Sequence, residues 1–206
     1  MSLRLSYNET TLASADPHTL SIFAWDAFNK RWDELGGTLF TTQQFVSVAT
    51  SRFTTYALMA TTTWRDEFYD FDGLNFPEEV SGVTLGVQGE GRALVLLSTA
   101  IEGVAVSLPI TPTTDFINWG GLTFSHTVDP PTTTLTVDVL TLTGTEVLTG
   151  VASGVDLTDL DAEGYPALKL RANLSSTVMG LTPALNWWRL AWEVEEYWVY
   201  LPVVLR

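Results

Sequence analysis

The sequence predicts an all-β protein, a β-sandwich or jelly roll with a smaller N-terminal β unit packed on it or linked to it. Threonine, valine and tryptophan are abundant, and β-branched and aromatic residues favour pleated, half-buried surfaces. Apolar residues mostly recur at every second position, which is the period of a β-strand. Segments rich in glycine, proline, threonine and aspartate separate these stretches, as turns separate the strands of an antiparallel sheet.

The first predicted unit covers residues 1–62, and its boundary depends mainly on charge. Residues 1–62 hold five acidic and four basic side chains, whereas residues 63–206 hold nineteen and six. A polar run at residues 60–63 follows the strand-like residues 52–59, which places a domain junction near residue 62. About sixty residues form a marginal core, so this unit docks on the second one or is part of a longer domain. A single continuous sandwich is the alternative.

The second predicted unit, residues 63–206, carries the clearest strand patterns. In residues 135–139, Thr136 and Asp138 are expected to face outward from the sandwich. Turn-forming residues at 88–91, 111–115, 129–131 and 143–144 separate the predicted strands. The inward sets in three strands are Leu135, Val137 and Val139, then Leu168, Leu170, Ala172 and Leu174, and finally Trp188, Leu190, Trp192 and Val194.

Charge and composition exclude several classes of function. A formal charge of -14 argues against binding to nucleic acid and against a polybasic membrane-surface role. The chain has no cysteine, which excludes disulfides, cysteine-zinc sites and thiol nucleophiles. The two histidines, His18 and His126, leave little for a histidine metal site or a histidine-dependent triad. No apolar run approaches the roughly 20 residues of a membrane helix, so we expect no membrane insertion.

Two parts of the chain resemble known secreted modules. Residues 21–26, 32–37, 46–50 and 52–58 resemble the closing strands of β-sandwich repeats in secreted bacterial cell-surface proteins. Residues 64–195 look like a galactose-binding-like jelly-roll domain, through residues 64–68, 151–157, 168–174 and 182–185. Residues 200–206 resemble a tail of secreted proteins from filamentous green bacteria. These resemblances imply a secreted or cell-surface location and frequent carbohydrate binding. Because a strand-like stretch begins almost at Met1, we expect a leader upstream of this sequence.

Acidic residues gather between positions 66 and 79, where six carboxylates lie within fourteen residues. Asp66, Asp70 and Asp72 offer the hard oxygen ligands that calcium prefers, and Gly73 suits a turn beside them. The spacing is not that of an EF-hand loop. The resemblance to galactose-binding-like domains implies a structural Ca²⁺ near the first strand of the module, and a solvated acidic loop is the alternative.

Two tryptophans are the candidate ligand-binding residues, together with Arg189. Trp119 lies before two glycines that could expose its indole at a loop tip. Strand alternation places Trp187 opposite to Trp188 and on the same face as Arg189. An apolar ring beside charged hydrogen-bonding groups suits a saccharide. Packing in the core is the alternative for both indoles, with Arg189, Lys169 or Arg171 only pairing across strands with Glu193, Glu195 or Asp138.

No pattern of catalytic residues stands out, so we expect that the protein is not an enzyme. Neighbouring carboxylates such as Glu78 and Glu79 point to opposite faces of a strand, which makes a poor catalytic pair. The sequence therefore predicts a non-catalytic extracellular binding module of a larger protein, with a polysaccharide or cell-surface glycan as partner. The alternatives are a structural or adhesive stalk unit and, less favoured, a glycoside-active enzyme. The apolar residues 197–205 predict pairing with another domain or a homodimer contact.

Overall fold

The structure of the protein is a computed structural model, which describes residues 1–8, 12, 15–88, 91–112 and 116–194. These residues form antiparallel sheets and a single turn of 3-10 helix, Pro17–Thr19, so the predicted all-β class is confirmed. The chain divides into two compact units. We call residues 1–64 the N-terminal unit and residues 65–194 the C-terminal unit, and each is described by itself.

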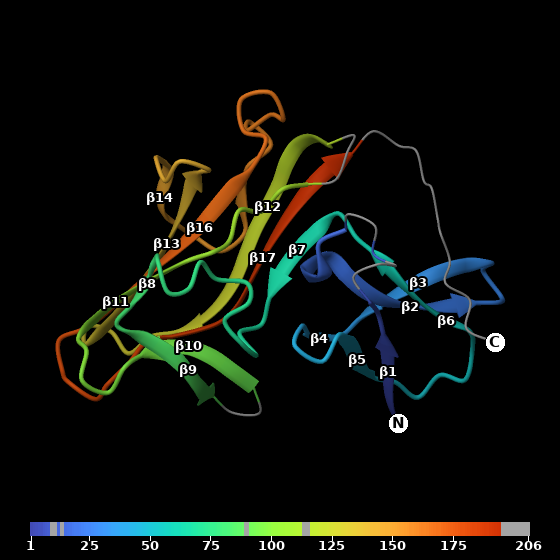
Figure 1. The fold of residues 1–206 in the computed structure, drawn as a ribbon, viewed down its shortest axis with the longest axis horizontal. Helices are drawn as coiled ribbons and strands as arrows, with labels where there is room; N and C mark the ends of the chain where they lie inside the picture. The colour runs from blue at the N-terminus through green and yellow to red at the C-terminus, as the bar shows by residue number, and fades with distance from the viewer. Residues whose placement is uncertain (9–11, 13–14, 89–90, 113–115, 195–206) are drawn as a thin grey trace. The chain divides into compact units, whose positions relative to one another are not determined.

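The N-terminal unit contains two three-stranded sheets (Figure 1). Strand β5 is central in one sheet and β2 is central in the other. Its core packs around four buried residues, Tyr7, Leu20, Ile22 and Val46. The strands are β1 (Ser2–Ser6), β5 (Phe45–Ala49) and β4 (Thr38–Phe40) in the first sheet, and β3 (Arg31–Gly36), β2 (Leu20–Asp26) and β6 (Tyr56–Ala60) in the second.

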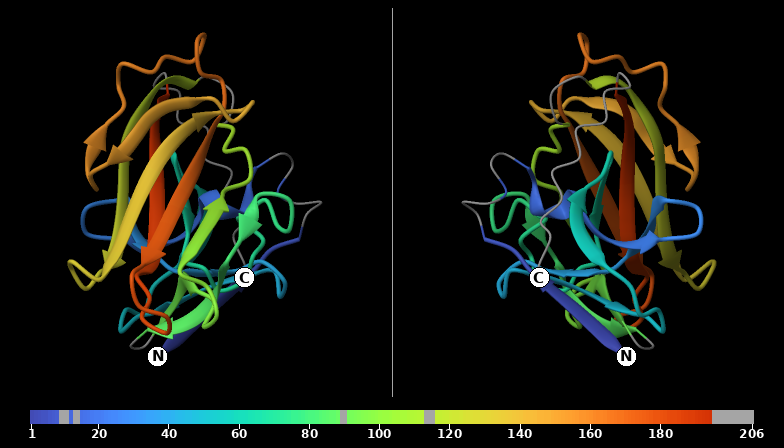
Figure 2. Two further views of the ribbon diagram at one scale, coloured as in Figure 1. Left: turned by 90° about the vertical axis from the view of Figure 1, so that its left-hand side faces the viewer. Right: turned by 90° about the vertical axis from the view of Figure 1, so that its right-hand side faces the viewer.

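The C-terminal unit is a larger two-sheet sandwich whose long strands lie in both layers (Figures 1 and 2). One sheet has the order β15 (Val155–Asp156), β12 (Phe116–Thr127), β17 (Ala184–Val194), β10 (Gly91–Leu96) and β9 (Val83–Gln88). The other has the order β14 (Glu146–Val151), β13 (Thr133–Thr141), β16 (Leu168–Ser176), β11 (Glu102–Val106) and β8 (Val80–Ser81). Strand β7 (Thr63–Asp66), in which the chain passes from one unit to the next, also pairs with β17.

The predicted alternation explains the core of the C-terminal unit. Every second residue of β16, from Leu168 to Leu174, is buried, and Trp188, Leu190 and Trp192 are buried in the same way on β17. Because alternate side chains of a strand face opposite sides of the sheet, each strand presents one continuous apolar face to the other layer. The predicted strands at 135–139, 168–174 and 188–194 are confirmed.

Three local predictions are wrong. Residues 52–55 form a loop, and the strand predicted from residue 52 begins only at Tyr56. Asp138, expected to face water, is only 3% exposed, because β14 packs beside it and donates a backbone hydrogen bond to it. Residues 118–121, expected in a loop, lie within strand β12.

Candidate ligand-binding site

Trp187 and Arg189 lie on the outer face of β17, as the alternation predicts. Both side chains are exposed, whereas Trp188, Leu190 and Trp192 between and beyond them are buried. The indole of Trp187 is 38% exposed, so part of its surface is covered by neighbours and part is open to a ligand. The structure therefore leaves one tryptophan of this strand on the surface, directly next to a buried one.

Polar residues of the neighbouring strand β12 lie opposite Trp187 and Arg189. The antiparallel register places Ser125 opposite Trp187 and Thr123 opposite Arg189, and residues directly opposite each other share a face of the sheet. The side-chain amide of Asn186 donates a hydrogen bond to the Ser125 hydroxyl, 3.2 Å away. We call the four residues Thr123, Ser125, Trp187 and Arg189 the β12–β17 surface. It combines a planar apolar ring with two hydroxyls and a guanidinium.

Trp119 corrects the first of the two tryptophan predictions. Its indole is fully buried, and its Nε1 donates a hydrogen bond to the backbone oxygen of Tyr165 at 2.8 Å. Trp119 also makes edge contacts with the rings of Phe116 and Trp192. An indole enclosed in this way cannot stack on a sugar, so the alternative that the sequence left open, core packing, holds for Trp119.

The glycines after Trp119 explain the error. A Cβ atom on Gly120 would lie 3.4 Å from the backbone of Ala191, and one on Gly121 would lie 3.8 Å from the oxygen of Val155. Both distances are ordinary van der Waals contacts, so the neighbouring strands would accept a side chain at either position, and both glycines lie inside strand β12. Two consecutive glycines predict a loop more often than a strand interior. Only the sheet register shows that Gly120 and Gly121 lie in a strand.

Asp66, Asp70 and Asp72 do not come together as metal ligands. Asp66 is buried, and its carboxylate accepts a hydrogen bond from the backbone N–H of Phe68 at 2.7 Å. The Asp70 carboxylate accepts one from the backbone N–H of Asp72 at 3.1 Å. In the part of the chain that the structure describes, no group of three or more histidine, cysteine, aspartate or glutamate side chains is placed to hold a metal ion. Two of the three predicted calcium ligands, Asp66 and Asp70, thus accept hydrogen bonds from nearby backbone N–H groups.

Arg171 and Lys169 form ion pairs across the second sheet. Arg171 donates to Asp138 at 2.6 Å and to Glu146 at 2.5 Å, and Lys169 donates to Glu79 at 2.7 Å. The cross-strand pairing of Arg171 with Asp138 was one of the pairs predicted, whereas the pairing of Lys169 with Glu79 was not. The Arg171 and Lys169 side chains are therefore already paired with carboxylates of this chain.

The pKa values of the two carboxylates follow from these contacts. Burial raises the pKa of Asp138, but hydrogen bonds from Gly150, Arg171 and Asn173 outweigh burial and lower it below its ordinary value. The hydrogen bond from Lys169 lowers the pKa of Glu79. Because the charged forms are stabilised, both groups are built for ion pairing rather than for proton transfer near neutral pH.

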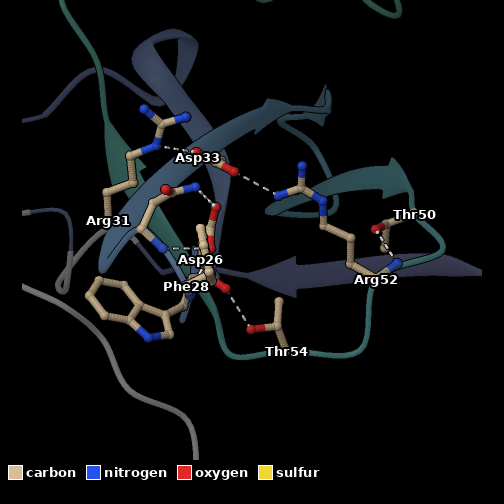
Figure 3. Close-up of polar contacts among 9 residues, drawn as sticks. Asp26, Phe28, Arg31, Asp33, Thr50, Arg52 and Thr54 are labelled. Atoms are coloured by element: carbon tan, nitrogen blue, oxygen red, sulfur yellow. Dashed lines mark hydrogen bonds and ion pairs between the residues drawn. The ribbon is translucent and has the colours of Figure 1, made fainter.

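A second surface, which the sequence did not single out, lies in the N-terminal unit (Figure 3). The Asp33 carboxylate accepts hydrogen bonds from Arg31 at 3.0 Å and from Arg52 at 2.9 Å. Arg31 and Asp33 lie at the start of β3, and Arg52 lies in the loop before β6. The turn before β3 holds Phe28 and the loop before β6 holds Phe53, and these rings are 93% and 92% exposed. The motif Asp26-Ala-Phe-Asn29 is a turn signal that could have indicated an exposed Phe28, but nothing near Phe53 indicates its exposure.

Some predicted features lie outside the described residues. These are the apolar tail at residues 197–205, with its expected dimer contact, residues 113–115 of a predicted turn, and Glu195. Of the histidines, His18 stacks on Trp64 with ring centroids 5.4 Å apart, and His126 is exposed on β12. Among the described residues, no helix is long and apolar enough to cross a membrane.

Comparison with known proteins identifies no family. No family model and no curated protein matches this chain. Among solved structures, the chain is similar to an isomalto-dextranase of Arthrobacter globiformis T6 complexed with panose, with 12% sequence identity and a TM-score of 0.42. The match covers 92% of this chain and 32% of that one, so the chain spans about a third of the length of that protein.

Proposed function

We propose that this chain is a non-catalytic binding module of a larger extracellular protein, and that it binds carbohydrate on the β12–β17 surface. The observation that carries the proposal is the position of Trp187 on the outer face of β17, where it shares the sheet face with Ser125, Thr123 and Arg189. A sugar ring has an apolar face of C–H groups and a rim of hydroxyls. The indole suits the apolar face, and the two hydroxyls and the guanidinium suit the rim.

The position of these residues on two long paired strands strengthens the proposal. Strands β12 and β17 pair along most of their length, and Trp188 and Leu190 anchor the inner face of β17 in the core. A site on such strands is held in place before the ligand arrives, and less entropy is lost on binding. The resemblance to galactose-binding-like domains agrees with a module of this kind and belongs to the same proposal.

Glycan-array binding followed by calorimetry tests the proposal. We expect Trp187→Ala to weaken binding of the recognised glycan at least about tenfold, the equivalent of about 1.4 kcal/mol, because the stacking surface is removed. Arg189→Gln should weaken glycan binding less, because the sugar hydroxyls can still bond to the hydroxyls of Thr123 and Ser125. Ile117→Ala is the matched control, because Ile117 is an apolar residue of β12 with 40% exposure, and it should bind as the parent protein does.

The alternative is a structural or adhesive stalk unit whose aromatic residues serve only packing. No binding to any glycan on the array would favour that alternative. Binding that is equal in Trp187→Ala and in the parent protein would place the ligand elsewhere and refute the proposed site. The two failures are distinct, because the first concerns the function and the second only its location.

A further inference from the structure

Two phenylalanines of the N-terminal unit are almost wholly in water. Phe28 follows β2 in the turn before β3, and Phe53 lies in the loop before β6, and each keeps more than nine tenths of its surface exposed. Leaving a phenylalanine side chain exposed forgoes roughly 1.5–3 kcal/mol of burial free energy. Isolated exposed apolar residues need no explanation, but two rings of this kind on neighbouring loops suggest a surface for a ligand.

The two loops lie at the same end of one sheet and are bonded to each other. The end of β2 lies beside the start of β6, because Ala24 pairs with Tyr56 in antiparallel register. The Thr54 hydroxyl donates to the backbone oxygen of Trp25 at 2.7 Å, and the Trp25 N–H donates to the oxygen of Thr55 at 2.9 Å. The ion pair between Arg52 and Asp33 ties the second loop to β3 (Figure 3).

The turn that carries Phe28 is also fixed internally. The Asp26 carboxylate accepts hydrogen bonds from the backbone N–H groups of Phe28 at 2.9 Å and Asn29 at 3.0 Å, and from the side-chain amide of Asn29 at 2.6 Å (Figure 3). Rings on loops held in this way lose little conformational freedom when a ligand binds. We call residues 26–33 and 50–55 the paired loops.

The paired loops carry positive charge in an acidic chain. They hold three basic residues, Lys30, Arg31 and Arg52, against two acidic ones. One carboxylate, that of Asp33, serves both guanidiniums, whose side chains are 68% and 49% exposed. Each guanidinium has five N–H donors, so donors remain for a ligand. Lys30 makes no ion pair with another described residue.

We propose that the paired loops bind an acidic polysaccharide, with sugar faces against Phe28 and Phe53 and carboxylates against Arg52, Arg31 and Lys30. Guanidinium groups bind carboxylates with paired hydrogen bonds, and exposed rings suit the C–H faces of sugars. The site lies in a different unit from the β12–β17 surface and does not depend on the function proposed there.

The charge of the N-terminal unit favours a thin polymer over other anionic partners. Residues 1–64 hold five acidic and four basic side chains, so an anionic membrane or a large acidic protein that covered this unit would also lie against its carboxylates, and like charges repel. A single polysaccharide chain can touch the two loops alone, and charges farther away than about 8 Å are largely screened at physiological salt.

Titration calorimetry with polygalacturonate, and with its methyl-esterified form as the uncharged match, tests the proposal. We expect the intact protein to bind polygalacturonate, at least about tenfold more weakly when salt is raised to about 0.3 M, because the contacts are ionic. The esterified polymer should bind at least about fivefold more weakly than the acid form. Lys30→Gln and Arg52→Gln should each weaken binding several-fold, and Phe28→Ala with Phe53→Ala should weaken it further.

Control variants separate this site from general charge effects. Arg4→Gln removes a basic residue of the same unit outside the paired loops and should bind as the parent protein does. Trp187→Ala should also leave polygalacturonate binding unchanged, so failure at the β12–β17 surface and failure at the paired loops are distinguishable. Lys30→Gln breaks no ion pair among the described residues, so it leaves the ion pairs of Asp33 with Arg31 and Arg52 in place.

Four outcomes would overturn the proposal. One is no binding of polygalacturonate, and another is equal binding of the esterified polymer. A third is an equal effect of Arg4→Gln and Lys30→Gln. The fourth is concentration-dependent self-association, or binding to vesicles of anionic phospholipid, that is lost in the phenylalanine variant while polygalacturonate binding persists. That last result would assign the rings to another copy of the chain or to a membrane.

Discussion

The most exposed aromatic side chains lie in the N-terminal unit, and most of the fully buried ones lie in the C-terminal unit. The C-terminal unit encloses Phe68, Trp119 and Trp188 completely, whereas the loops of the N-terminal unit leave Phe28 and Phe53 almost fully exposed. Trp64 is an exception in the N-terminal unit, where it is buried and stacks on His18. The interior of a domain grows with its size, so the larger unit encloses more of its rings, but the position of each ring on a strand or in a loop decides its burial.

The largest expected effect is the difference between truncating a buried aromatic ring and truncating an exposed one. Trp119→Ala removes a fully buried indole and its hydrogen bond to Tyr165, so we expect it to lower the free energy of unfolding by about 3–5 kcal/mol. Phe28→Ala, which truncates a ring that is 93% exposed, should cost less than about 1 kcal/mol, and Trp187→Ala, whose indole is partly covered, should fall between the two. Urea denaturation of the intact chain measures all three, and similar losses in the three variants would refute the comparison.

A smaller effect is expected from the carboxylates that stabilise each unit. Asp138 lies buried in the C-terminal unit and binds Arg171, Asn173 and the Gly150 N–H, whereas Asp26 caps an exposed turn. Asp138→Asn keeps the shape of the side chain but removes its charge, and we expect a loss of about 2 kcal/mol at neutral pH. Asp26→Asn should cost less, because the hydrogen bonds it weakens are open to water.

The pH dependence of unfolding sharpens this prediction. Burial raises and hydrogen bonds lower the pKa of Asp138, with a net value below the ordinary one. A carboxylate with a lowered folded-state pKa stabilises the fold above its unfolded pKa of about 4, and this contribution is lost as pH falls through the folded pKa. Stability should therefore decrease below about pH 4 in the parent protein and decrease less steeply in Asp138→Asn. An identical slope in the two proteins would contradict the assignment.

Turn chemistry predicts a third and smaller difference. The hairpin turns of the N-terminal unit contain Lys30 at φ 53° and Gln44 at φ 55°, whereas turns of the C-terminal unit use Gly144, Gly154 and Gly180 at positive φ. Left-handed backbone costs a non-glycine residue roughly 1 kcal/mol. Gln44→Gly should therefore stabilise the protein by up to about 1 kcal/mol, whereas the control Gln43→Gly should destabilise it slightly. Calorimetric melting measures both, and destabilisation by Gln44→Gly would show that no strain is stored at this turn.

The sequence predicts the burial of side chains where burial follows from alternation along one strand. It misses burial that depends on which strands pack beside one another. The burial of Leu168 to Leu174 and the surface position of Trp187 follow from the two-residue period alone. The burial of Trp119 and Asp138 depends on which strands pack beside them, and that information lies in residues such as Ala191 and Gly150, far away in the sequence. Phe53 looks like part of a strand by composition, and only the start of β6 at Tyr56 leaves it in a loop.

The smallest expected effect concerns calcium, and it contrasts the acidic segment of the C-terminal unit with the paired loops. Basic groups of the paired loops converge on Asp33, whereas Asp66 and Asp70 accept separate backbone hydrogen bonds. A ligand stabilises a fold only as far as it binds the folded state, and dispersed carboxylates hold calcium weakly. Excess calcium and excess chelator should therefore give melting temperatures within about 1 °C of each other. A higher melting temperature in calcium, abolished by Asp70→Asn and kept in the control Asp159→Asn, would show that these carboxylates rearrange into the metal site that the sequence predicts.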